Sequence, residues 1–155
     1  MKTAIFVGRF QPFHKGHEFT IKPLFKKFDK IIIVIGSTNK KNKENPFSFN
    51  ERRRMINKVF SNYRNRYKII GMPDIGIDKK WAKSIMKKAR FDAVVTGNSW
   101  TKRCFKKFGI EVIKPRFIKP KTYNASRIRK LIRKNKNWEK LVPKGVVKII
   151  KKSLS

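Results

Sequence analysis

The chain carries, at residues 8–17, the stretch Gly8-Arg9-Phe10-Gln11-Pro12-Phe13-His14-Lys15-Gly16-His17. The apolar run before it, residues 4–7, predicts a buried strand, and residues 18–28 after it repeat apolar side chains at helical spacing. Two glycines and a proline let the backbone turn tightly between these two segments. The stretch therefore predicts a strand, a glycine turn and a helix in succession.

The same turn gathers groups that suit an anion. Backbone N–H groups at a helix start lack intrahelical partners and lie at the positive end of the helix dipole. The only two histidines, His14 and His17, are three residues apart, so both rings can face one ligand, and Arg9 adds a permanent charge. Gly16 lets that ligand approach the backbone. We expect a phosphate here; the alternatives are a structural histidine pair or a metal pair, although no cysteine or carboxylate ligands are nearby.

Length and composition indicate one globular domain over residues 1–155, because 39% of the residues are hydrophobic. No apolar run approaches the roughly 18–20 residues that span a bilayer. The first residues lead straight into a strand and do not resemble a signal peptide, so we expect no membrane association. The single cysteine, Cys104, excludes an internal disulfide and fits a reducing cytoplasm.

The charge of the chain is strongly unbalanced, with 42 Lys and Arg against 9 Asp and Glu and a formal net charge of +33. Such a balance favours nucleic acid, because each neutralised phosphate releases counterions. The basic residues are nevertheless spread along the whole chain, without a terminal arm, a Cys/His finger or an RNA-binding aromatic signature. We therefore expect nonspecific adhesion to nucleic acid as a physical tendency rather than as the selected function.

The remaining pattern alternates strands with helices. Ile31–Ile35 is β-branched almost throughout, as is typical of a parallel strand covered by helices on both faces. Ser48 and Glu51 form a capping box that starts a helix. Further strands are predicted at 67–71, 91–96 and 111–113, and further helices at 81–89, 100–108 and about 143–152. The fold class is therefore α/β, a doubly wound sheet of five parallel strands.

The histidine motif resembles a known signature. His-x-Gly-His after the first strand is similar to the signature of the nucleotidylyltransferase superfamily, which has a Rossmann-like fold. The longer string Gly-Arg-Phe-Gln-Pro-Phe-His resembles the archaeal type of nicotinamide mononucleotide (NMN) adenylyltransferase. The resemblance runs from about Ala4 to Ile150, nearly the whole chain, and includes Asn45-Pro46-Phe47 and Trp-x-x-Leu-Val-Pro near the end.

The resemblance implies a set of site residues. As catalytic residues it implies His14, His17, Arg9 and Arg129. As ATP- and phosphate-binding residues it implies Gly8, Phe10, Gly16, Asn98, Ser126 and Ile128. As NMN-binding residues it implies Asp74, Asp78 and Trp81. Spacing alone leaves Trp81 equally compatible with a core residue, and Gly97-Asn98 with a turn that needs no ligand.

Two departures from the family pattern stand out. The resemblance would place an asparagine at position 78, whereas Asp78 only accepts hydrogen bonds when ionised and would repel a carboxylate. In the second signature, serine–small–Ser/Thr–x–Ile–Arg, Ser126, Ile128 and Arg129 match, but Asn124 replaces the serine and Ala125 the glycine. Asparagine remains a good N-cap, while alanine would block a positive φ angle if one is required.

The reaction that the resemblance implies is adenylyl transfer from ATP to NMN, giving NAD and pyrophosphate. Mg²⁺ would be bound mainly by ATP oxygens, since carboxylates are few, and no protein metal ligands are expected. The family implies a hexamer, which the charge opposes. Alternatives remain: an adenylyl- or cytidylyltransferase for another phosphate acceptor, such as FMN or phosphopantetheine, or a basic nucleic-acid-binding protein on an inactive nucleotidyltransferase scaffold.

Overall fold

The computed structural model describes all 155 residues, and its centre is a sheet of five parallel strands. The strands are β1 (Thr3–Gly8), β2 (Lys30–Ile35), β3 (Tyr67–Gly71), β4 (Ala93–Val95) and β5 (Glu111–Ile113). Their order in the sheet is β3-β2-β1-β4-β5. The order reverses beside β1, so β1 and β4 flank the switch point at which such sheets bind ligands, beyond the carboxyl ends of the strands. The predicted fold class is confirmed.

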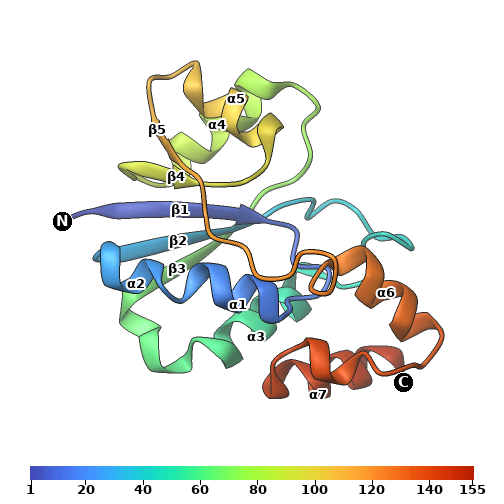
Figure 1. Cartoon of the computed structure of the whole chain (residues 1–155). Coiled ribbons are helices and arrows are strands. Elements are labelled where there is room, and N and C mark those ends of the chain that lie inside the picture. Colours follow the sequence, from blue (N-terminus) through green and yellow to red (C-terminus); the bar gives the residue numbers. More distant parts are fainter.

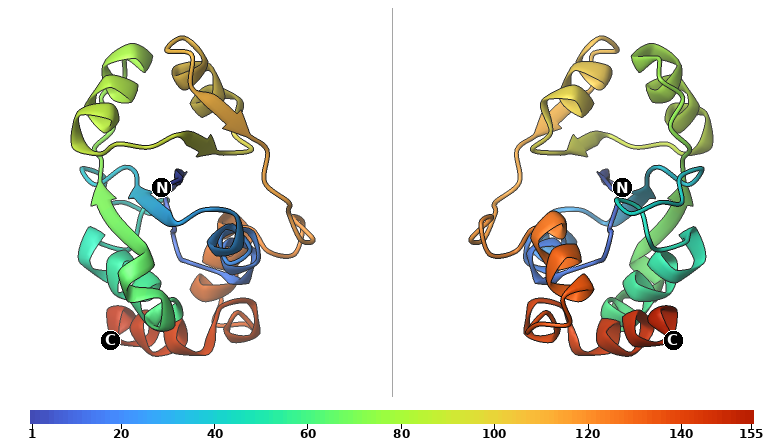
Figure 2. Two further views of the ribbon diagram at one scale, coloured as in Figure 1. Left: turned by 90° about the vertical axis from the view of Figure 1, so that its left-hand side faces the viewer. Right: turned by 90° about the vertical axis from the view of Figure 1, so that its right-hand side faces the viewer.

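Helices cover both faces of this sheet (Figure 1). One layer holds α4 (Asp78–Lys88) and α5 (Ser99–Lys106), while the other helices lie on the opposite side, as the side views of Figure 2 also show. These are α1 (Lys15–Ile21), α2 (Leu24–Lys27), α3 (Phe49–Val59), α6 (Ala125–Arg133) and α7 (Lys144–Leu154), with the 3₁₀ helices η1 (Ser61–Arg66) and η2 (Glu139–Leu141).

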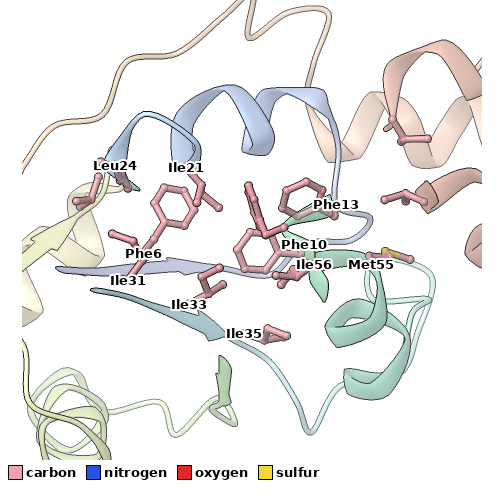
Figure 3. Packing of buried hydrophobic residues seen from close by; sticks show 14 of the residues in the cluster. Phe6, Phe10, Phe13, Ile21, Leu24, Ile31, Ile33, Ile35, Met55 and Ile56 are labelled. Atoms are coloured by element: carbon pink, nitrogen blue, oxygen red, sulfur yellow. The ribbon is translucent and has the colours of Figure 1, made fainter. Parts of the chain in front are cut away.

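The sheet contributes side chains to two separate hydrophobic cores, because successive side chains of a strand point to opposite faces. Phe6, Ile31 and Ile33 join a cluster of 23 buried residues under α1, α3 and α7, part of which Figure 3 shows. Ile5 and Ile32 instead join a cluster of 10 buried residues under α4 and α5. The β-branched run of β2 is thus buried on both sides, as its composition predicts.

The helix expected over residues 18–28 is two helices. It breaks between Ile21 and Leu24 because Pro23 has no N–H to continue the hydrogen-bond ladder and clashes with the preceding turn. The other differences are shifts of element ends: β4 spans only Ala93–Val95, and α4 begins at Asp78, before the predicted start at residue 81. The capping box of Ser48 and Glu51 is present in both directions.

None of the helices combines the length and apolar character needed to cross a membrane.

Candidate active site

The two histidines face each other at the start of α1. His14 is its N-cap, and its ring stacks on that of His17 with centroids 3.7 Å apart and planes inclined by 25°. The N–H groups of Gly16 and His17 donate to His14 Nδ1 at 3.0 and 3.4 Å, and the N–H of His14 donates to His17 Nδ1 at 3.1 Å. The N–H groups that we expected to be free for an anion are therefore bound by His14.

This reciprocal capping fixes the tautomer of both rings. An Nδ1 that accepts a hydrogen bond carries no proton, so each neutral ring holds its proton on Nε2. Burial lowers the pKa of His14 to about 4. Burial also lowers the pKa of His17 well below its usual value, and the neighbouring charge of His14 lowers it further. At neutral pH the pair therefore offers two uncharged Nε2–H donors that no protein acceptor occupies.

The two glycines of the motif make room for rings. A Cβ on Gly16 would lie 2.8 Å from the ring of His14, and a Cβ on Gly8 would lie 2.9 Å from the ring of Phe10. Phe10 itself is buried, with φ at 53°, and packs edge-on against His17 at a centroid distance of 4.8 Å. Gly16 and Gly8 are thus required by the packing of the histidine pair and of Phe10.

The histidine pair lines a cavity of about 330 Å³ together with both predicted arginines. Arg9 and Arg129 come from the turn after β1 and from α6, so the cavity joins the first and the last third of the chain. Its wall also includes Gln11, Thr20, Phe117, Tyr123 and Asn124. Of these, Gln11 lies in the first motif and Asn124 in the second signature. Sequence reasoning gave no site role to Thr20, Phe117 and Tyr123, because no local pattern shows that α1 and the loop after β5 meet.

Arg129 is almost fully buried and held in place. It is 5% exposed, its Nη1 donates to the carbonyl of Gln11 at 2.8 Å, and its Nη2 donates to Glu44 Oε2 at 2.9 Å. Its Nε is buried without a partner. Ile128 beside it is fully buried in the larger core, so its side chain anchors α6.

The start of α6 keeps its cap although the motif is altered. Asn124 is the N-cap, and its Oδ1 accepts from the N–H of Arg127 at 2.8 Å. Ala125 is the first helical residue and needs no positive φ, so alanine is compatible with this backbone. Ser126 is exposed and its hydroxyl makes no hydrogen bond within the protein.

Arg52 holds the backbone beneath the site; the resemblance to the archaeal family includes Glu51-Arg52 but implied no role for Arg52. It is fully buried, and its Nη1 donates at 2.8 Å both to the carbonyl of Arg9 and to that of Gly36. Its Nε donates to the carbonyl of Ser48 at 3.2 Å. Burial, with the charge of Arg9, lowers the pKa of Arg52 to about 10. Arg52 therefore joins the segments that follow β1 and β2 to the start of α3.

A second cavity of about 340 Å³ opens beside the first, between the ends of β1 and β4. It is lined by Gly8, His17, Asn98 and Phe117, and Asn98 also caps α5 by accepting from the N–H of Thr101 at 3.0 Å. Phe117 is 54% exposed, and its ring lies where a Cβ on Gly97 would be, 2.4 Å away. Phe117, which lines both cavities, is an aromatic residue that no motif indicated.

The residues expected to contact NMN lie at the same edge of the sheet. Both oxygens of Asp74 accept from the hydroxyl of Ser37, at 2.9 and 3.0 Å, and Asp78 Oδ1 accepts from the indole of Trp100 at 2.7 Å. The side chain of Trp81 is only 4% exposed and packs in the smaller core, as the alternative interpretation expects. The indole beside it, Trp100, is partly exposed. Contact between Trp81 and NMN stays a prediction.

The structure contains no group of three or more His, Cys, Asp or Glu side chains that could hold a metal ion.

A cavity walled by uncharged N–H donors and arginines, at the switch point of a parallel sheet, suits an enzyme that transfers a phosphate-bearing group. The sequence profile of the cytidylyltransferase-like family matches residues 5–152. The protein is a nucleotidyltransferase of this class.

Curated relatives narrow the assignment. The nicotinamide-nucleotide adenylyltransferase of Methanococcus aeolicus is 38% identical over 149 residues, which are 95% of this chain and 87% of that protein. That of Thermococcus onnurineus is 37% identical over 154 residues, 97% of this chain and 82% of the relative. The chain belongs to the nicotinamide-nucleotide adenylyltransferase family.

Solved structures agree with this fold. The bifunctional NMN adenylyltransferase/ADP ribose pyrophosphatase of Francisella tularensis, crystallised with AMP and a manganese ion, superimposes with a TM-score of 0.75 at 29% identity. The match covers 91% of this chain but only 44% of that bifunctional protein. Thermotoga maritima TmcAL, at a TM-score of 0.70 and 13% identity, shares the fold alone.

Proposed function

We propose that this protein transfers the adenylyl group of ATP to the 5′-phosphate of NMN, giving NAD and pyrophosphate. The observation that carries the proposal is the His14–His17 pair, whose two uncharged Nε2–H donors lie in the wall of a cavity with Arg9 and Arg129. The activity named for the curated relatives and for part of the Francisella tularensis enzyme supports it.

The reaction suits these groups because its nucleophile is already an anion. The phosphate of NMN needs no base to activate it, so the protein has to bring two anions together and stabilise the charge that grows in the transition state. In this proposal His14 and His17 donate to oxygens of the α-phosphate, and Arg9 contacts phosphates of both substrates. Arg129, with the start of α6 at Ser126, holds the leaving pyrophosphate.

Mg²⁺ enters this proposal as part of the MgATP substrate. The lack of a carboxylate cluster supports that assignment, because Mg²⁺ prefers oxygen ligands and the triphosphate supplies them. The manganese ion in the Francisella tularensis structure is found with AMP, which is compatible with a divalent ion that accompanies the nucleotide.

The test is a coupled assay of the purified protein with ATP, Mg²⁺ and NMN, in which alcohol dehydrogenase reduces any NAD formed. The acid analogue of NMN and FMN are assayed in parallel by chromatography. We expect NAD formation, and a loss of about 10² to 10³ in kcat for His17→Ala, the usual cost of one transition-state donor. His17→Gln, which keeps an acceptor for the His14 N–H, controls for the cap. An unimpaired His17→Ala enzyme, or no product with any acceptor, contradicts the proposal.

The remaining proposals concern location and association. A buried free thiol, Cys104, supports a reducing cytoplasm as the compartment.

The net charge of +33 supports salt-sensitive adhesion to nucleic acid and opposes close self-association, so a homo-oligomer such as a hexamer needs bound anions. Light scattering with and without pyrophosphate tests the oligomer, and RNA binding without ATP turnover would favour an inactive scaffold instead.

A further inference from the structure

One of only two ion pairs in the protein lies at the cavity. Glu44 Oε2 accepts from Arg129 Nη2 at 2.9 Å, and the glutamate side chain is 59% exposed whereas the arginine is 5% exposed. The other pair, Lys151 with Glu139 at 3.6 Å, lies on exposed surface near the end of the chain. The chain has only nine acidic residues, and one of them is paired with a buried arginine of the candidate active site.

Asn45, the residue after Glu44, binds Arg9, the other arginine of the cavity. Asn45 Oδ1 accepts from Arg9 Nη1 at 3.4 Å, so two consecutive residues of one polar loop, residues 38–45, bind both arginines that line the cavity. Side-chain oxygens of this loop therefore occupy one donor nitrogen on each of the two arginines.

The Nη2 of Arg129 is the donor nitrogen at which an exchange can occur. Its Nη1 is fixed by the carbonyl of Gln11, and its Nε is enclosed without a partner. A carboxylate and a phosphate are both acceptor-only anions that bind the same guanidinium fork, so they compete for it. We propose that Glu44 is an affinity-determining residue of the triphosphate subsite, an internal carboxylate that the phosphates of ATP must displace from Arg129.

The loop is built so that this displacement costs little. Asn42 Oδ1 accepts from the backbone N–H groups of Glu44 and Asn45 at 3.1 and 3.0 Å, so the turn holds its shape without the Glu44 side chain. The Glu44 carboxylate is itself 59% exposed, so water can solvate it once it leaves Arg129. The hydrogen bond and charge of Arg129, followed by the charges of Arg133 and Lys43, hold the pKa of Glu44 below its usual value, so the competitor is an anion at neutral pH.

The test compares two glutamates with similarly exposed carboxylates, one paired with the buried Arg129 and the other with the exposed Lys151. Glu44→Gln and Glu139→Gln each remove one exposed, paired carboxylate and raise the net charge equally, so the second controls for general electrostatics. Binding of inorganic pyrophosphate and of ATP without NMN is measured by calorimetry. We expect Glu44→Gln to bind both about two- to five-fold more tightly than Glu139→Gln. In turnover, KM for ATP should fall while kcat does not rise.

Two outcomes overturn the inference. Equal affinity of the two variants would mean that Glu44 does not compete, and weaker binding by Glu44→Gln would mean that it positions Arg129 for the ligand. Glu44→Ala serves as a second variant, with the same expected direction. The inference rests on the proposed function for the identity of the anion. The experiments nevertheless distinguish a failure of the inference from a failure of the proposed function. The wild-type assay with ATP and NMN tests the reaction, while the ratio of the two variants tests the competition.

Discussion

The indole Nε1–H of Trp100 donates to Oδ1 of Asp78 at 2.7 Å, joining the first turn of α5 to the first residue of α4. No protein donor binds the other oxygen, Oδ2. The indole of Trp100 also packs against the buried ring of Trp81, with ring centroids 4.8 Å apart, and this contact fixes the position of the donor. Asp78 is therefore presented at the ligand-binding edge of the sheet as an oriented acceptor.

An oriented acceptor should select the amide form of the nucleotide. A carboxamide can donate to Asp78, whereas the carboxylate of the acid analogue is repelled. We expect Asp78→Asn to raise kcat/KM for the acid analogue relative to NMN by about tenfold, the equivalent of roughly 1.4 kcal/mol. The measurement is kcat/KM for both substrates in wild type and variant. An unchanged ratio would show that this carboxylate does not face the base.

The role of the indole can be separated from that of the carboxylate by a double-mutant cycle. Trp100→Phe keeps an aromatic ring but removes the N–H donor. We expect kcat/KM for NMN to fall about three- to tenfold, which corresponds to the loss of one hydrogen bond. In an Asp78→Ala background the same change should have almost no effect, because residues that act through one contact are not additive. Full additivity would mean that Trp100 acts independently of Asp78.

Arg52 should be a stability residue. Arg52→Met leaves the carbonyls of Arg9, Gly36 and Ser48 without this donor, so we expect the free energy of unfolding to fall by roughly 2–4 kcal/mol. Urea denaturation measures the change. Arg54→Met, an exposed neighbour on the same helix, should shift it by less than about 0.5 kcal/mol. Similar losses in the two variants would contradict the role assigned to Arg52.

His14 should make stability depend on pH below neutrality. Its pKa is about 4 in the folded protein, against an ordinary value of 6.5, so between these values the unfolded chain binds more protons than the folded one. Stability should therefore rise with pH across this window, and the contribution should be complete above pH 6.5. Over the whole window this contribution of His14 is on the order of 3 kcal/mol. His14→Asn keeps a cap acceptor, so its stability between pH 7 and 4.5 should fall less steeply than that of wild type.

Salt should stabilise the protein strongly. The chain has 42 basic residues and only two ion pairs, so most of its positive charge is balanced by no protein carboxylate. Screening reduces this self-repulsion, and multivalent anions reduce it further. We expect the melting temperature to rise between 20 and 500 mM NaCl, and to rise at lower concentrations of pyrophosphate. An unchanged Tm across both series would contradict this prediction.

The sequence allowed the sheet to be predicted because its strands have an unambiguous pattern. Ile31–Ile35 is apolar on both faces, which indicates a strand covered by helices on both sides. The apolar run at residues 4–7 is followed by two glycines and a proline, which indicate a tight turn from a strand into a helix. The cavity residues from distant motifs, Arg9 and Arg129, were also predicted, because both belong to recognisable signatures. Element ends were harder: the break at Pro23 was missed because apolar spacing continues across it.

What could not be predicted depends on which groups meet in space. Trp81 has the spacing of a helix residue on an apolar face, and only the packing of α4 against α5 decides that the indole is buried. Arg52 looks like any basic residue in a basic chain, yet its guanidinium is fully buried and donates to three backbone carbonyls. The Glu44–Arg129 pair spans 85 positions, so no local pattern could reveal it.

The unequal division of the interior on the two sides of the sheet has a dynamic consequence. The α4/α5 layer rests on a cluster of 10 buried residues, against 23 on the other side. Segments with less buried apolar surface open locally at lower free energy. Amide protons of α4 and α5 will therefore exchange with deuterium sooner than those of β1, β2 and α3. The half that carries Asp78 and Trp100 should therefore open locally at a lower free energy than the half that carries the histidine pair.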